Sequence, residues 1–186
     1  DAFLKQSGLF SQKSEKWPLF RGRLMFPIRD RQGRTIAFSG RDLTGDEKAP
    51  KYINSPETQI YQKKENYFGL YEAKNTIAEG KIGPILCEGN FDVVSMHQAG
   101  YTSAIASLGT SFTNEQCANM KKWYPNNQVF NILYDSDAAG QKSTERALLI
   151  LNRNGFEQRV HKLSTAKDAS ELLERDGEEG VKNEFE

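Results

Sequence analysis

Short apolar runs alternate with longer amphipathic stretches through the second half of the chain. Four of these runs are bounded by turn residues and predict β-strands: residues 85–87, 104–106, 129–134 and 158–163. The stretches between and after them predict α-helices: residues 91–99, 114–124, 138–152 and a short helix from Ser170. Strands that alternate with helices over short connections form a parallel sheet, so this half is predicted to be α/β.

The first half of the chain has a different pattern. Apolar runs at residues 24–28 and 35–38 flank a Gly-containing turn and predict a β-hairpin. Residues 40–56 are polar, contain Gly and Pro and show no periodicity, so they are predicted to form a loop. Residues 69–79 predict a helix that ends at Gly80.

The two patterns meet near Gly83 and Pro84, where we place the domain boundary. Residues 1–18 are polar with scattered apolar positions and are predicted to be a partly ordered lead-in. The predicted domains are a smaller α+β subdomain at residues 1–81, the α/β domain at residues 82–177, and a tail or the start of a following segment at residues 178–186.

The formal net charge of zero argues against a nucleic-acid binder, but it is a sum of unlike parts. Residues 1–81 contain 15 Lys and Arg against 10 Asp and Glu, a net charge of +5. Residues 82–186 contain 10 against 15, a net charge of −5. A basic half beside an acidic half suits a polyanion-binding surface and a metal-binding site, although an imbalance of this size also arises by chance.

No apolar run approaches the length that crosses a membrane, and the first residues do not form a signal peptide. We therefore expect a cytoplasmic protein with no membrane partner. The chain begins with Asp1 rather than Met, which favours a piece of a longer protein. Cys87 and Cys117 lie far apart with no zinc-ligand spacing, so two buried free thiols are expected.

Carboxylates follow three of the four predicted parallel strands. Glu88 directly follows the first strand, Asp135 and Asp137 follow the third, and Asp168 follows the fourth. Ligands of open parallel sheets bind at the carboxyl ends of the strands, so these four side chains are expected to converge there. Such a cluster requires a cation, and hard oxygen ligands suit Mg²⁺ or Mn²⁺. Each motif alone would more often be a helix cap or a solvated turn, whereas both together favour the metal site.

Two motifs make this prediction more specific. The segments EGNFD at residues 88–92 and DSDAAG at residues 135–140 resemble the paired signature of the Toprim domain, which topoisomerases, primases, recombination proteins and small nucleases share. Further blocks resemble, in order, the catalytic core of bacterial DNA primase (DnaG): FRGRLMFPI at 20–28, AFSGR at 37–41, PKYINSPET at 50–58, GLY at 69–71 and SLGT at 107–110. The resemblance extends from Trp17 to Asp176.

The resemblance implies synthesis of short RNA primers from ribonucleoside triphosphates on a single-stranded DNA template during replication. Glu88, Asp135 and Asp137 match the carboxylates that bind two or more Mg²⁺ or Mn²⁺ ions in the family. Asp92 matches the other acidic position of the first motif and is predicted to be catalytic with them. It lies about one helical turn beyond Glu88, where it could bind metal through water or orient a ligand.

Asp168 matches the first Asp of a later Asp-Pro-Asp-Glu motif of the family and is predicted to be a further metal ligand. Here the motif reads DASE, with Ala169 in place of the Pro and Ser170 in place of the second Asp. One potential ligand of this motif is therefore missing from the chain.

Seven residues match positions that bind nucleotide phosphates and nucleic-acid backbone in the family: Arg21, Arg23, Arg41, Lys51, Tyr52, Asn54 and Lys63. Lys and Arg contact phosphates, and Tyr and Asn add polar contacts. Any one of the basic residues could instead be a solvated surface residue. The resemblance also implies that zinc is bound outside this sequence, and that the replicative helicase is contacted through a domain outside it.

Two other functions fit part of the pattern. A Toprim nuclease or a piece of a topoisomerase would keep the carboxylates but lack the PKYINSP block at residues 50–56. A catalytically silent module that binds single-stranded DNA or nucleotides would keep the basic residues, and Ser170 is compatible with it. The expected function is the catalytic core of a bacterial primase.

Overall fold

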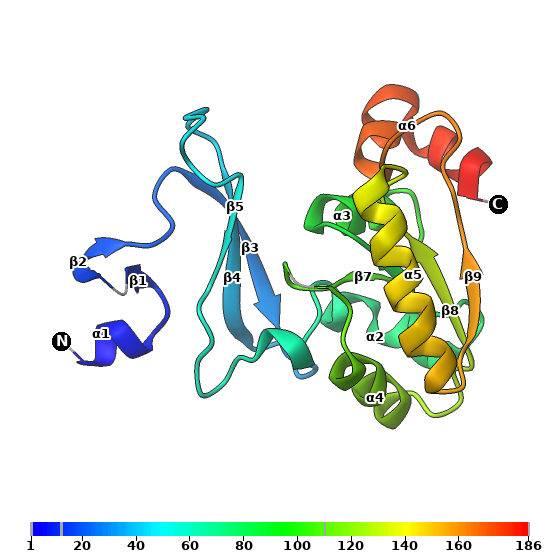
Figure 1. Ribbon diagram of the computed structural model, residues 1–186, viewed down its shortest axis with the longest axis horizontal. Coiled ribbons are helices and arrows are strands. Elements are labelled where there is room, and N and C mark those ends of the chain that lie inside the picture. The colour runs from blue at the N-terminus through cyan, green and yellow to red at the C-terminus, as the bar shows by residue number, and fades with distance from the viewer. Residues whose placement is uncertain (1, 12, 110, 186) are drawn as a thin grey trace. The chain divides into compact units, whose positions relative to one another are not determined.

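The computed structural model describes residues 2–11, 13–109 and 111–185 (Figure 1). Thr110, which ends the SLGT block, and Asp1, Gln12 and Glu186 lie outside the described residues. The chain forms two compact units, Asp1–Lys63 and Lys64–Glu186. The predicted domain boundary between residues 81 and 82 stays a prediction.

The first unit is built on a three-stranded antiparallel sheet, ordered β3-β4-β5. The predicted hairpin is confirmed as β3 (Arg23–Arg29) and β4 (Thr35–Asp42), joined by a turn in which Gly33 has a positive φ of 88°. Asp30 stabilises this turn because its carboxylate accepts hydrogen bonds from the backbone N–H groups of Gln32 and Arg34. Phe26, Ile28 and Ala37 point to the buried face of the hairpin.

The loop prediction for residues 40–56 is wrong at both ends. Strand β4 continues to Asp42, and residues 52–54 form a third strand, β5 (Tyr52–Asn54), which pairs with β4. A three-residue strand is too short to show a period, and Pro50 and Pro56 on either side of it indicate a loop. Pairing with a strand distant in sequence decides the conformation instead of the local pattern.

The lead-in contains more regular structure than its composition indicates. It forms a short helix, α1 (Ala2–Gln6), and an antiparallel pair, β1 (Phe10–Ser11) and β2 (Ser14–Pro18). Leu19 continues this segment, with its N–H donating to the carbonyl of Leu9 at 2.9 Å.

The second unit contains the predicted parallel sheet, ordered β7-β6-β8-β9. Its strands are β6 (Ile85–Cys87), β7 (Ala104–Ala106), β8 (Val129–Leu133) and β9 (Glu157–Val160), and all three pairings are parallel. The sequence-based prediction of an α/β Toprim-type domain preceded by a smaller α+β subdomain is therefore confirmed.

The α-helices of this unit begin close to the predicted residues. They are α2 (Leu70–Glu79), α3 (Asn90–Gln98), α4 (Asn114–Trp123), α5 (Ala138–Arg153) and α6 (Ala169–Phe185). A 3₁₀ turn that the sequence did not predict, η1 (Lys63–Glu65), lies at the boundary of the two units. Gly80 ends α2 in the left-handed region, with φ 70°. The last helix is longer than predicted, since it resumes after a kink at Gly177 and extends to Phe185.

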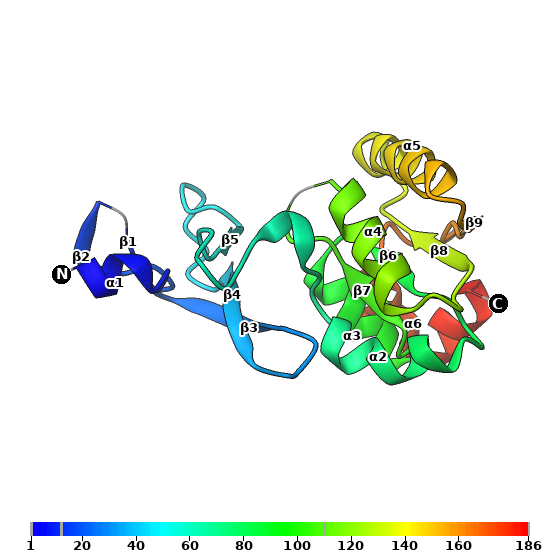
Figure 2. The same ribbon diagram turned by 90° about the horizontal axis from the view of Figure 1, so that it is seen from below.

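The helices cover both faces of the parallel sheet. Leu86 is the register partner of both Ile105 and Ile132, so all three side chains point to the same face of the sheet. On that face they pack in one core cluster with apolar side chains of α2, α4 and α5. Figure 2 shows α5 on one side of the strands and α6 on the other. Strands β6, β7 and β8 are thus buried on both faces, whereas β9 at the edge of the sheet is largely exposed. Within the described residues, no helix is long and apolar enough to span a bilayer.

Candidate active site

The carboxyl ends of two neighbouring strands bring the first two acidic motifs together. Cys87 and Leu133 are register partners at the ends of β6 and β8, so the chain leaves the sheet at the same edge after each of them. Glu88 follows β6 directly, and its Oε2 accepts a hydrogen bond from the backbone N–H of Asp135 at 3.4 Å. Partial burial and the negative charge of Asp135 raise the pKa of Glu88.

Asp137 has two roles, one for each carboxylate oxygen. Its Oδ1 accepts hydrogen bonds from the N–H groups of Ala139 and Gly140, both at 3.0 Å, and thereby caps α5. These hydrogen bonds, together with the ammonium of Lys167, lower the pKa of Asp137. The other oxygen, Oδ2, takes no part in the cap and lies 3.3 Å from Lys167 Nζ.

Lys167 lies against both aspartates and was missed by the sequence analysis. Its Nζ is 3.1 Å from Asp135 Oδ2 and 3.3 Å from Asp137 Oδ2, and the two carboxylates raise the pKa of Lys167. A lone Lys beside an acidic residue is normally a surface residue. One signal could have identified Lys167: it directly precedes Asp168, which was already expected at the carboxyl edge of the sheet.

The donor set fits a small divalent cation. Two carboxylate oxygens, Asp135 Oδ2 and Asp137 Oδ2, already converge on one positive charge. Mg²⁺ is often bound by only one or two protein carboxylates, with water and substrate phosphates completing its shell. Over the ranges that the structure describes, however, no three or more His, Cys, Asp or Glu side chains gather closely enough to hold a metal ion. Glu88 lies beside the pair rather than in it.

Asp92 is a buried carboxylate that connects two motifs. It is 8% exposed and accepts hydrogen bonds from the N–H of Gly89 at 3.0 Å and from the N–H of Ser170 at 3.3 Å. The first bond closes the N-terminal turn of α3, and the second ties that turn to α6. Burial, followed by the negative charges of Asp168 and Asp135, raises the pKa of Asp92 to about 7.

We expect Asp92→Asn to change how stability depends on pH. Between its ordinary pKa of 3.8 and about 7, folded Asp92 keeps a proton that the unfolded chain releases, so rising pH destabilises the wild-type fold. From about pH 5 to about pH 8, the free energy of unfolding of Asp92→Asn should therefore rise relative to wild type by about 2 kcal/mol. Urea unfolding in EDTA at several pH values measures this difference. Parallel curves for the two proteins would contradict it, and Glu174→Gln on the exposed surface of α6 is the control.

Asp168 caps the N-terminus of α6 in the described structure. Its Oδ1 accepts a hydrogen bond from the N–H of Glu171 at 2.8 Å, and its carbonyl accepts one from the N–H of Leu172 at 3.2 Å. The side chain follows β9 at the predicted edge, but its contacts are those of a helix cap. Its role as a metal ligand stays a prediction.

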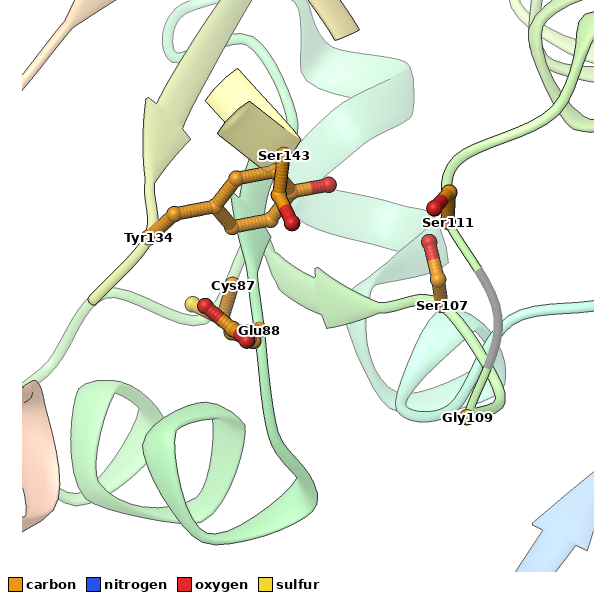
Figure 3. A pocket seen from close by; sticks show the side chains of 7 residues that line it. All are labelled: Cys87, Glu88, Ser107, Gly109, Ser111, Tyr134 and Ser143. Carbon is orange, nitrogen blue, oxygen red and sulfur yellow. The ribbon is translucent and has the colours of Figure 1, made fainter. Parts of the chain in front are cut away.

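A cavity of about 340 Å³ opens beside Glu88 (Figure 3). It is lined by Cys87, Glu88, Ser107, Gly109, Ser111, Tyr134 and Ser143. The Tyr134 ring and the Ser143 hydroxyl lie over Glu88, while the hydroxyls of Ser107 and Ser111 point toward each other on the opposite side. The cavity therefore offers hydroxyl groups next to a carboxylate, which suits a polar ligand.

Both cysteines are free and buried, as the sequence predicts.

The predicted nucleic-acid residues all lie in the first unit. Arg41 and Tyr52 are direct partners on β4 and β5, and Asn54 follows two residues later, so all three lie on one face of the sheet. Lys51 is exposed immediately before β5, and Lys63 begins η1. The exposed Arg21 lies over the ring of Trp17 at 5.2 Å.

Arg23 differs from the other six. Its side chain is 7% exposed, and its Nη1 donates hydrogen bonds to the carbonyls of Gly40 at 3.1 Å and Pro50 at 2.8 Å. Its Nη2 is 3.9 Å from Asp42 Oδ1. These contacts join β3 to β4 and to the segment before β5, so Arg23 supports the sheet. Contact of Arg23 with nucleic acid stays a prediction.

Both parts of the chain are similar to known protein families. Residues 1–74 match the family described as DNA primase catalytic core, N-terminal domain, and residues 85–173 match the family described as Toprim-like. The DNA primase of Clostridium acetobutylicum is 40% identical over 178 residues, which cover 95% of this chain and 28% of the relative. The chain thus spans about a quarter of that protein.

Solved structures show the same similarity. The crystal structure of the zinc-binding and RNA polymerase domains of the Aquifex aeolicus primase superposes with a TM-score of 0.86 at 36% identity, covering 99% of this chain and 45% of the other. A DnaG primase catalytic domain bound to single-stranded DNA superposes with a TM-score of 0.81 at 34% identity, covering 97% of this chain and 56% of the other. The chain therefore belongs to the DnaG primase family, as part of a catalytic core that contains the Toprim domain.

Proposed function

We propose that the chain is a catalytic piece of a bacterial primase, which synthesises short RNA primers on single-stranded DNA by metal-dependent nucleotidyl transfer. One observation carries the proposal: in a chain of the DnaG family, Glu88 and Asp135 meet at the ends of neighbouring strands, with Asp137 beside them. We further propose residues 82–177 as the Toprim domain and residues 1–81 as the basic subdomain.

In the proposed site, Asp135 and Asp137 would hold a divalent cation, with Glu88 beside them at the end of β6. A divalent ion bound there would supply positive charge that neutralises the triphosphate and favours deprotonation of the attacking 3′-hydroxyl. Asp137 keeps its orientation because Oδ1 is fixed by the cap of α5. Partial burial and the negative charge of Asp135 raise the pKa of Glu88, and the positive charge of a nearby cation would oppose that rise.

The first unit is proposed to contact phosphates. Arg41 and Lys51 supply positive charge, and Tyr52 and Asn54 add polar contacts from the same strand region. Arg21 and Lys63 extend this basic surface, which we propose contacts the single-stranded template and the incoming ribonucleotide. Such contacts depend on salt because counterions are released from the nucleic acid.

A primer-synthesis assay on the purified chain tests the proposal. Mn²⁺, a single-stranded DNA template and ribonucleoside triphosphates are supplied, and we expect RNA products that require both the template and the metal. Binding of the same template is followed in parallel by fluorescence anisotropy. Template binding without any product would overturn the polymerase function and leave a binding module, while metal-dependent cleavage of the template would indicate a Toprim nuclease.

A further inference from the structure

The closest charge neighbours of the Asp135 and Asp137 carboxylates include a cation supplied by the chain itself. The ammonium of Lys167 lies 3.1 Å from one carboxylate and 3.3 Å from the other. Two carboxylates held two residues apart in one loop repel each other, and a positive charge between them relieves that repulsion. Lys167 therefore stands where a divalent ion would otherwise balance the pair.

The backbone of Lys167 is fixed to the same loop. Its carbonyl accepts a hydrogen bond from the N–H of Ser136 at 3.1 Å, and its N–H donates to Glu171 Oε2 at 2.9 Å. Ser136 lies between the two aspartates, so the Cα of Lys167 is held beside them by main-chain contacts. The position of the residue does not depend on its ammonium group.

The side chain, in contrast, is able to leave. It is 51% exposed, and Asp135 and Asp137 are its only partners among the ion pairs of the described residues. A Lys side chain has four rotatable bonds and a strongly hydrated head group, so the ammonium can move into water without a change in the backbone. The hydrogen bond between the Ser136 N–H and the Lys167 carbonyl uses main-chain atoms only, so movement of the side chain does not require it to break.

We propose that Lys167 is the resident counter-ion of the Asp135–Asp137 pair and is displaced when a divalent cation binds. This inference rests on the metal site of the proposed function. Because the cation must compete with an ammonium that is already in place, Lys167 weakens metal binding to the chain and stabilises the metal-free loop. The metal and the ammonium compete for the same two carboxylates, and the metal binds only the arrangement in which the ammonium has moved away. Removal of the ammonium removes this competition, so the affinity for the metal should rise.

Lys167→Met tests the inference through metal affinity rather than activity. Mn²⁺ binding to the full chain is measured by titration calorimetry, with electron paramagnetic resonance of free Mn²⁺ as a second readout, in the absence of nucleotide and DNA. We expect Lys167→Met to bind Mn²⁺ roughly fivefold more tightly than wild type, the effect of losing an exposed ion pair. In EDTA its melting temperature should be lower than that of wild type, and saturation with Mn²⁺ should raise it further than it raises wild type.

Two control variants separate competition from loss of charge. Lys167→Arg keeps a cation at the site and should bind Mn²⁺ with nearly wild-type affinity. Lys162→Met removes an exposed charge from the same connection between β9 and α6 and should change the affinity by less than about twofold, because exposed charges are screened. If Lys167→Met does not fold, as judged by circular dichroism, Lys167→Gln serves in its place.

The outcomes distinguish the inference from the metal site on which it rests. Wild-type affinity in Lys167→Met, or weaker binding than wild type, would overturn the counter-ion role while leaving the metal site in place. An equal gain in Lys162→Met would also overturn it, since charge alone would then explain the effect. No Mn²⁺ binding by the wild-type chain at millimolar concentration would overturn the metal site, and the inference with it.

Discussion

Replacement of Asp137 by Asn is expected to abolish metal-dependent nucleotidyl transfer while leaving the fold intact. Asn is as good a helix cap as Asp, so the amide oxygen can accept the hydrogen bonds that Ala139 and Gly140 now donate to Oδ1. The negative charge facing Lys167 is lost, however, and with it one of the two oxygens that converge there. We expect the rate of primer synthesis to fall by at least about 100-fold, as for loss of a metal ligand.

In EDTA, Asp137→Asn should unfold cooperatively and stay close to wild type, because it keeps the cap and loses only an exposed ion pair with Lys167, which separates this variant from a misfolded one. Asp137→Ala loses the cap as well as the charge, so it should be both inactive and less stable. Asp176→Asn, an exposed change on α6 where Asp176 pairs with Arg175, is the matched control and should keep wild-type activity. Primer synthesis by Asp137→Asn at more than a tenth of the wild-type rate would contradict the role of Asp137.

Gly140→Ala is expected to produce the largest loss of stability in this part of the chain. Gly140 is buried in the first turn of α5, where an added Cβ would lie 2.7 Å from the carbonyl carbon of Asp135 and closer still to its oxygen. Backbone cannot move aside as a flexible side chain can, so the helix and the loop must separate. We expect the free energy of unfolding to fall by about 3 kcal/mol, the upper end of the usual cost of overpacking.

Urea unfolding in EDTA measures this change without interference from metal. Ala139→Ser adds one heavy atom to the neighbouring, exposed position of the same turn and should stay within about 0.5 kcal/mol of wild type. If Gly140→Ala were as stable as Ala139→Ser, close packing of α5 on Asp135 would not be the reason for Gly at this position.

The second unit could be predicted from its sequence because its strands are short apolar runs and its helices are periodic. The expected meeting of Glu88 and Asp135 needed one further fact, that parallel strands end at the same edge of a sheet. The structure brings Asp137 to the same edge but uses one of its oxygens, and the side chain of Asp168, for helix caps. A cap and a metal ligand have the same residue type, and only the contacts tell them apart.

Other features depend on contacts that leave no local trace in the sequence. Arg21 and Arg23 stand in one short block, yet one is exposed and the other is buried against the carbonyls of Gly40 and Pro50. The position of Lys167 depends on a hydrogen bond to Ser136, distant in sequence. Strand β5 exists because β4 is available to pair with it. Each of these three features is determined by tertiary contacts, which a local sequence pattern does not reveal.

The strand order of the parallel sheet also determines when Glu88 and Asp135 can first meet while the chain is being translated. Strand β6 lies between β7 and β8, and β8 is made last of the three. Until residues 129–133 leave the ribosome, one edge of β6 has no partner and Glu88 has no carboxylate beside it from the later motif. The proposed metal site is therefore complete only after β8 has been made and has paired with β6.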